Sequence, residues 1–314
     1  PHSRMAGISP VKLQDVSEDG LLDILLADLP PGRGTVGGPG DDCAVVRGYG
    51  IRQLLLLKTD CVVESIHYLP EDEPQRVGWK AFCRPLSDVA AMGGEPLHAL
   101  VSIMSPQDRT VSYWKSFYKG LIKAAAHFGV GIVGGETSRS VRAAVSVSLV
   151  GHVETGRLIT RSGGQPNDLL FVTGTLGGSL RGRHLDFVPR VAEGRWLGAH
   201  GYARAMMDLS DGLATDLPRL AGASKCGFEI DFAALPRTRG CDSNHALCDG
   251  EDYELLLAVA PRLAGRLRRG WKETFPGVRL TEIGRLTEAG TPSTVLPAGF
   301  DHFWVTRSSI VGAG

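Results

Sequence analysis

Two spacings of apolar residues alternate along the chain. Apolar residues three or four positions apart predict amphipathic helices, whereas compact apolar runs predict strands. In the first half these patterns predict helices over residues 17–29, 78–92 and 111–128, and strands over residues 43–46, 51–57, 129–136 and 143–153.

Three local features refine this prediction. Ser17 is suited to cap the first helix, and Pro85 is expected to break or kink the second. The four consecutive leucines at 54–57 predict a strand that is buried on both faces.

The second half repeats the alternation after a turn-rich stretch that follows residue 155. We therefore predict two domains, residues 1–155 and 156–314, of a mixed α/β class. Segment 251–258 fits a helix or a strand. The other predicted elements are strands 168–173, 205–208 and 227–231, and helices 189–198, 212–223 and 260–269.

Composition excludes several classes of protein. The 314 residues are 43% hydrophobic and 22% charged, with a net charge of zero, so no overall field attracts nucleic acid or an anionic membrane. We expect a cytoplasmic protein, because no apolar run is long enough to span a membrane and no signal peptide opens the chain. We expect residues 1–4, before Met5, to be a tag remnant, and the six cysteines, which form no CxxC pair, to be reduced.

Nucleotide-binding loops of the common kinds are absent from the sequence. No P-loop motif occurs. A formal G-x-G-x-x-G begins at Gly32, but it follows a predicted helix and leads to a strand, which is the reverse of the dinucleotide-binding order.

Acidic residues recur beside glycines and at the ends of apolar runs. Individually, Asp88 and Asp211 could cap helices, and Asp41 with Asp42 could form an ordinary turn. Together, such carboxylates would repel one another unless a cation lay among them. Oxygen ligands of this kind suit Mg²⁺, which commonly accompanies phosphates. The full set is Asp41, Asp42, Asp60, Asp88, Glu136, Asp208 and Asp211.

Three further residues are candidates for the same site. Arg161 lies in a glycine-rich loop where a guanidinium could bind a phosphate, although a surface arginine fits equally. His67 could contact a ligand or be a half-buried structural histidine. Lys58 precedes Asp60 at the predicted end of the leucine strand, and we predict that its ammonium occupies or repels one cation position.

Eight motifs, in order, resemble the thiamine-monophosphate kinase family, within the superfamily of aminoimidazole ribonucleotide synthetase and selenophosphate synthetase. The resemblance extends from about residue 17 to 304. It implies a two-domain α/β fold, a homodimer whose N-terminal domains form a β-barrel, and ATP between the N- and C-terminal domains. The motifs are GDDCAVV, KTDCVVESIHY, KAFCRPLSDVAAMGGEP, VGGETSRS, LITRSGGQPNDLLFVTGTLGGS, MDLSDGLATDL, GEDYELLLAV and GFDHF.

The resemblance also implies roles for individual residues, with Asp42, Asp60, Arg161 and Asp211 central to catalysis. The magnesium positions are Asp42, Thr59, Asp60, Asp88, Glu136, Asp208 and Asp211. The ATP positions are Gly135, Glu136, Arg161 and Ser210, and the thiamine phosphate positions are His67, Glu251 and Phe300.

The implied reaction is Mg²⁺-dependent transfer of the γ-phosphoryl group of ATP to a phosphate monoester. The acceptor oxygen is already anionic near neutral pH, so no general base is needed. Catalysis would consist of positioning and charge neutralisation.

The sequence departs from the family pattern at the outer magnesium positions and near the acceptor. Lys58 replaces a small residue, Glu136 an aspartate, Asp249 a glycine and Pro85 an asparagine, and a helix and loop before His184 are missing. Two alternatives therefore stay open. One is a related ATP-dependent enzyme with another acceptor, for which His67, Asp249 or Glu251 could be the base. The other is a non-catalytic nucleotide-binding protein.

Overall fold

The computed structural model describes residues 16–27, 29–30, 32–48 and 52–298. The chain divides into two compact units, one of residues 1–32 with 300–314 and the other of residues 33–299. In the first unit, helix α1 (Glu18–Leu26) begins after Ser17, whose hydroxyl accepts a hydrogen bond from the Gly20 N–H at 3.1 Å. The predicted N-cap is confirmed. All other elements below belong to the second unit.

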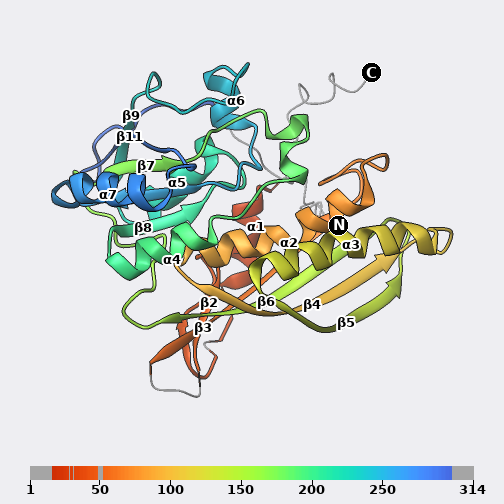
Figure 1. The fold of residues 1–314 in the computed structure, drawn as a ribbon. Coiled ribbons are helices and arrows are strands. Elements are labelled where there is room, and N and C mark those ends of the chain that lie inside the picture. The colour runs from red at the N-terminus through yellow and green to blue at the C-terminus, as the bar shows by residue number, and fades with distance from the viewer. Residues whose placement is uncertain (1–15, 28, 31, 49–51, 299–314) are drawn as a thin grey trace, which may run out of the picture. The chain divides into compact units, whose positions relative to one another are not determined.

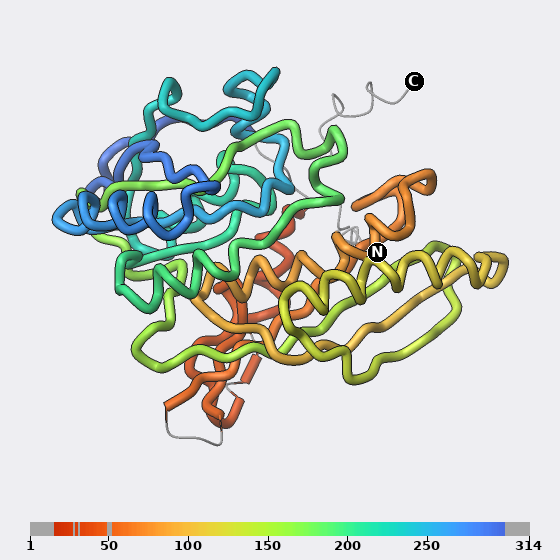
Figure 2. The backbone as a smooth tube through the Cα atoms, viewed as in Figure 1, coloured from red at the N-terminus to blue at the C-terminus, as the bar shows by residue number. Residues whose placement is uncertain are grey.

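The first sheet of this unit has the strand order β1-β2-β3-β6-β4-β5 (Figure 1). Neighbouring strands are antiparallel except β4 and β5, which helix α3 (Val111–Phe128) joins as a parallel crossover that can be followed in Figure 2. Sequence analysis did not predict β1 or β4. The strands are β1 (Thr35–Gly37), β2 (Ala44–Arg47), β3 (Gln53–Val63), β4 (Glu95–Ser105), β5 (Gly131–Arg139) and β6 (Ala144–Glu154).

Helices α2 (Pro74–Ala91) and α3 lie against one face of this sheet. The prediction that the leucine run is buried on both faces was wrong. Leu54 and Leu56 face the core, whereas Leu57 is 39% exposed, because side chains alternate along a strand and the described residues cover one face only. Strand β5 was likewise expected to be buried, and it is a largely exposed edge strand.

Helix α2 runs without a break through Pro85, so the predicted break does not occur, whereas a kink there stays a prediction. Burial of almost the whole helix outweighs the one backbone hydrogen bond that proline removes. Two glycines bring α2 and α3 unusually close. A Cβ at Gly78 would lie 2.0 Å from the Phe117 carbonyl oxygen, and one at Gly120 would lie 1.7 Å from that of Gln75. Helix α2 is therefore held in place along its length.

The second sheet is antiparallel with the order β8-β10-β7-β11-β9. Helices α5 (Leu213–Ala223) and α6 (Ser243–Cys248) pack on one face, and α4 (Val191–His200) and α7 (Pro261–Thr274) pack on the other. The strands are β7 (Leu169–Thr173), β8 (Ala203–Asp208), β9 (Gly227–Ile230), β10 (Leu255–Val259) and β11 (Leu280–Thr287).

Burial on both faces explains why β10 is apolar throughout. Leu256 and Ala258 face one core, and Leu255, Leu257 and Val259 face the other. The ambiguous segment 251–258 is therefore a strand from residue 255. The first sheet ends at Glu154 and the second begins at Leu169. The domain boundary at residue 155 stays a prediction.

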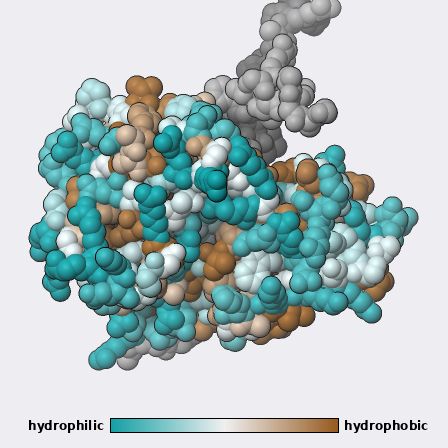
Figure 3. Space-filling view, turned by 45° about the horizontal axis from the view of Figure 1, so that its top comes forward, coloured by the Kyte–Doolittle hydropathy of each residue, from teal (hydrophilic) through white to brown (hydrophobic). Residues whose placement is uncertain are grey.

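Between β7 and α4 the chain forms only two short 3₁₀ helices, η2 (Ser179–Arg181) and η3 (Arg183–Leu185). On the face of the molecule in Figure 3, hydrophilic residues predominate and hydrophobic ones form small separate groups. Within the described ranges, no helix combines the length and apolar character that a membrane crossing needs.

Candidate active site

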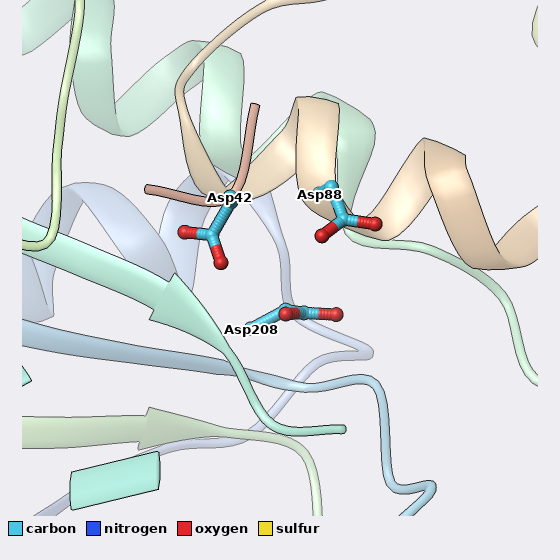
Figure 4. A group of neighbouring side chains, drawn as sticks. All are labelled: Asp42, Asp88 and Asp208. Atoms are coloured by element: carbon cyan, nitrogen blue, oxygen red, sulfur yellow. The ribbon is translucent and has the colours of Figure 1, made fainter. Parts of the chain in front are cut away.

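Three buried carboxylates converge at one point of the second unit. Asp42 precedes β2, Asp88 lies on α2 and Asp208 ends β8, and an oxygen of each lies within 4.8 Å of the other two (Figure 4). All three residues are at most 6% exposed. Segments far apart in the sequence therefore bring together three of the seven acids in the predicted set.

The donor set fits Mg²⁺, which prefers carboxylate oxygens to nitrogen or sulfur. Asp42 Oδ2 is buried and has no hydrogen-bond partner among the described residues, so one ligand oxygen is free to take a cation. Burial and the neighbouring carboxylates raise the pKa of Asp88, and burial and Asp42 raise that of Asp208 to about 7. Carboxylates this close together repel one another when ionised, unless a cation binds among them.

The raised pKa of Asp208 predicts how the metal-free protein responds to pH. Between about pH 4 and 7 the folded protein holds a proton that an unfolded aspartate has released, so the free energy of unfolding falls as the pH rises. Raised pKa values at Asp88 and Asp41 act in the same direction. Urea unfolding in EDTA should show this fall, and Asp208→Asn should make it shallower. An unchanged pH dependence in the variant would contradict the assignment.

Lys58 lies directly against this cluster. Its Nζ donates to Asp88 Oδ1 at 2.6 Å and lies 4.0 Å from Asp60 Oδ2. Burial lowers the pKa of Lys58, but the charges of Asp88 and Asp60 raise it by a larger amount. The net pKa is raised, so the ammonium stays charged. Both Lys58 and Asp60 lie in the middle of β3, which corrects their predicted place at a strand end.

Arg161 is tied to the cluster rather than free on the surface. Its guanidinium donates to Asp42 Oδ1 from Nη2 at 2.6 Å and from Nε at 3.1 Å, and its backbone N–H donates to Asp41 Oδ1 at 2.9 Å. Burial raises the pKa of Asp41 to about 6. The Arg161 loop is thus fixed beside the carboxylate with the free oxygen.

Asp211 and Ser210 lie in the turn after β8, and neither caps helix α5, whose N-cap is Gly212. The Asp211 carboxylate accepts a hydrogen bond from Arg219, and the Ser210 carbonyl accepts one from the Glu251 N–H at 2.6 Å. Asp211 is not among the three converging acids. Its role at the metal stays a prediction.

Other predicted metal and ATP residues lie apart from the three acids. The Thr59 side chain points to the opposite face of β3 from Lys58, where its hydroxyl contacts Ser146 at 3.1 Å. Gly135 and Glu136 lie on exposed β5, and Glu136 accepts a hydrogen bond from the next backbone N–H. A Cβ at Gly135 would lie 1.8 Å from a β4 carbonyl oxygen, so glycine is needed there.

On the predicted acceptor side, Glu251 accepts hydrogen bonds from Lys80 at 2.7 and 2.8 Å and lies 2.9 Å from His184 Nδ1. The His67 carbonyl accepts a further bond from Lys80 at 2.5 Å. Two of the three predicted acceptor residues are thus joined by one lysine. The third, Phe300, lies outside the described residues.

Asp249 does not add its charge directly to Glu251. Its backbone is right-handed helical (φ −62°), so glycine is not required there, and its carboxylate accepts the Gly178 N–H at 2.7 Å. The left-handed conformation belongs to Gly250 (φ +68°), which packs on the Ser210 carbonyl. The fold therefore accommodates aspartate in place of glycine at this position, because the Asp249 carboxylate anchors the loop at Gly178.

Sequence reasoning missed the cations around the site. Lys80, Arg84, His184 and Arg219 were not identified, although Arg84 lies 4.0 Å from Asp60. One pattern could have found two of them, since Lys80, Arg84 and Asp88 follow one another at four-residue intervals along α2. Residues spaced in this way share one side of a helix.

Comparison with known proteins places this site in a family. Residues 40–153 match the family described as AIR synthase related protein, N-terminal domain, and residues 178–296 match its C-terminal domain. Thiamine-monophosphate kinase of Escherichia coli K12 is 33% identical over 305 residues, covering 85% of this chain and 91% of that protein. The chain belongs to the thiamine-monophosphate kinase family. The enzyme of the same name from Aquifex aeolicus is 34% identical and covers 93% of this chain and 100% of its own length.

A solved structure of this family gives the same result. AaThiL complexed with AMPPCP and TMP superposes with a TM-score of 0.81 at 33% identity, covering 94% of this chain and 100% of that one. The resemblance found in the sequence is therefore confirmed, together with the two-domain AIR synthase-related α/β fold and the kinase class.

Proposed function

We propose that this chain transfers the γ-phosphoryl group of ATP to thiamine monophosphate, giving ADP and thiamine diphosphate. The observation that carries the proposal is the convergence of Asp42, Asp88 and Asp208, with a buried Asp42 oxygen that has no partner among the described residues, in a chain that spans nearly all of its kinase relatives. A relative with this fold has been solved with the ATP analogue AMPPCP and with TMP.

In this proposal, Asp42, Asp88 and Asp208 hold Mg²⁺, which when bound neutralises charge on the phosphate oxygens. Arg161 lies beside Asp42 and supplies a guanidinium that can turn from the carboxylate to a phosphate. The acceptor phosphate attacks the γ-phosphorus in line, the bond to the ADP oxygen breaks, and no proton has to be removed from the acceptor.

The state of Glu251 supports a phosphate acceptor over a hydroxyl acceptor. Although burial raises its pKa, hydrogen bonding from His184 and the charge of Lys80 lower it to about 2. A carboxylate with that pKa is a weak base near neutral pH. The Asp249 carboxylate accepts a hydrogen bond from the Gly178 N–H. Glu251 and Asp249, two of the three candidate bases of the alternative enzyme, are therefore poorly suited to act as a base.

The test is incubation of the protein with ATP, Mg²⁺ and thiamine monophosphate, followed by chromatographic detection of thiamine diphosphate. Formation of thiamine diphosphate in proportion to ADP supports the proposal. Binding of Mg-ATP without that product would favour another acceptor. Absence of Mg-ATP binding would leave only a non-catalytic protein.

We also propose that two chains pair through the uncovered face of the first sheet. Leu57, Leu100 and Val133 are 39%, 49% and 61% exposed there and line a cavity of about 420 Å³. Apolar groups on an uncovered sheet face favour burial against another surface. A second copy of this face, as in the expected barrel, would also cover the strands that carry Thr59, Gly135 and Glu136.

Sedimentation tests this pairing. The wild-type chain should sediment with twice its mass of 33.5 kDa, and Leu57→Asp should shift it toward the monomer. Val141→Asp, at a loop residue that is 96% exposed, should leave the mass unchanged. A monomeric wild type would refute the dimer.

The cytoplasmic location stays a prediction.

A further inference from the structure

Lys80 is a fully buried lysine that the reaction above does not use. It lies on α2 and is 0% exposed. Its Nζ contacts the two Glu251 carboxylate oxygens at 2.7 and 2.8 Å, His184 Nδ1 at 2.7 Å and the His67 carbonyl oxygen at 2.5 Å. All of these contacts go to segments outside α2.

These contacts join three segments that are distant in sequence. His67 follows β3, His184 lies in η3, and Glu251 lies in the turn before β10. Segment η3 is fixed to α2 a second time, because Arg76 on α2 pairs with Asp186. Lys80 thus ties the two described segments of the predicted acceptor site, at His67 and at Glu251, to one helix.

The backbone at Glu251 needs such support. Its φ of +51° is in the left-handed region, which a residue with a side chain adopts at a cost. The turn is held by the Glu251 N–H donating to the Ser210 carbonyl at 2.6 Å and by the carboxylate on Lys80. Removing the ammonium would leave this mostly buried carboxylate with only His184 to orient it.

Stability alone is a weak reason for this ion pair. Burial lowers the pKa of Lys80 to about 8 although Glu251 raises it, so keeping this lysine charged inside the protein carries a desolvation cost. Replacing a buried ion pair with apolar groups of similar volume is often neutral or stabilising. The pair therefore suits a role in fixing geometry.

Helix α2 links that geometry to the carboxylate cluster. Asp88 lies eight residues after Lys80, on the same side of the helix, which at 1.5 Å per residue separates them by about 12 Å along the axis. Because α2 is buried and closely packed on α3, this separation is rigid.

We propose that Lys80 is a positioning residue for the acceptor: it holds Glu251 and the His67 segment at a fixed place relative to the Asp42–Asp88–Asp208 cluster. The inference rests on the proposed function, because it assigns these segments to binding of the acceptor phosphate ester. Lys80 acts through Glu251 and does not itself touch the reacting atoms.

The test compares Lys80→Met, Glu251→Gln and the double variant with the wild type, using Lys119→Met, at an exposed position of α3, as the matched control. Lys80→Met should raise the KM for thiamine monophosphate at least about tenfold, while the KM for ATP and kcat change less than about threefold. In the double variant this KM should rise little above that of Glu251→Gln, because Lys80 acts mainly through Glu251 and keeps only the contacts to the His67 carbonyl and His184.

A KM for thiamine monophosphate within twofold of wild type, or equal rises for both substrates, would overturn the proposal. If Lys80→Met does not fold, the double variant decides, because it leaves no unpaired charge buried. A KM of the double variant well above that of Glu251→Gln would refute positioning through Glu251.

A wild type that is inactive on thiamine monophosphate refutes the proposed function instead. Amide exchange of peptides around residues 67, 184 and 251, without substrate, then decides whether Lys80 fixes these segments, which should exchange faster in Lys80→Met.

Discussion

Asp42→Asn is expected to lower kcat by about 1,000-fold, the scale seen when one preorganised electrostatic group is removed from an active site. The substituted side chain keeps the size of aspartate and an oxygen for Arg161, but it loses the charge of a carboxylate whose Oδ2 is buried and unpartnered among the described residues. The affinity for Mn²⁺, measured by electron paramagnetic resonance, should fall together with kcat. The fall should appear in kcat more than in the KM for thiamine monophosphate.

A matched control separates this effect from a general loss of charge. Asp108→Asn changes an exposed aspartate in the loop before α3 and should leave both kcat and Mn²⁺ binding as in the wild type. Asp208→Asn should resemble Asp42→Asn, since its carboxylate belongs to the same cluster. A variant at Asp42 that retained normal turnover and normal Mn²⁺ affinity would remove this cluster from the reaction.

Periodicity predicted those elements whose two faces differ clearly. Helix α3 has an apolar stripe, a capping Thr110 that accepts the Tyr113 N–H, and a left-handed Gly129 at its end, and its predicted bounds were confirmed. The pattern could not show which strands are covered on both faces. Similar leucine runs lie in β3, covered on one face, and in β10, covered on both. That difference is set by which helices pack on each sheet.

The carboxylates of the site were easier to predict than its cations. Glycines beside Asp41 and Asp211, and the apolar run that ends at Asp208, indicate acids held close to a ligand. Lys80 and Arg84 occur in a stretch that reads as an ordinary amphipathic helix. Their importance comes from tertiary contacts with Glu251 and Cys61, which no local pattern contains.

Lys58→Ser is the second change with a large expected effect. Lys58 places a fixed positive charge 2.6 Å from Asp88 and 4.0 Å from Asp60, where a divalent ion could otherwise bind. Without metal, serine would leave Asp88 buried and unpaired, so the free energy of unfolding should fall by about 3 kcal/mol. With Mg²⁺ present, the protein should bind one more ion and recover that stability, because the carboxylates then need another cation.

Two further variants distinguish the charge of Lys58 from the space that it fills. Lys58→Met removes the charge but keeps the bulk, so it should lose stability without gaining an ion. Lys119→Ser, at an exposed position of α3, should change neither quantity. The number of ions is measured by Mn²⁺ titration and the stability by urea unfolding, each with and without metal. If Lys58→Ser binds the same number of ions at the same affinity as the wild type, the ammonium does not stand in for a metal. Lys58 would then be only the ion-pair partner that orients Asp88.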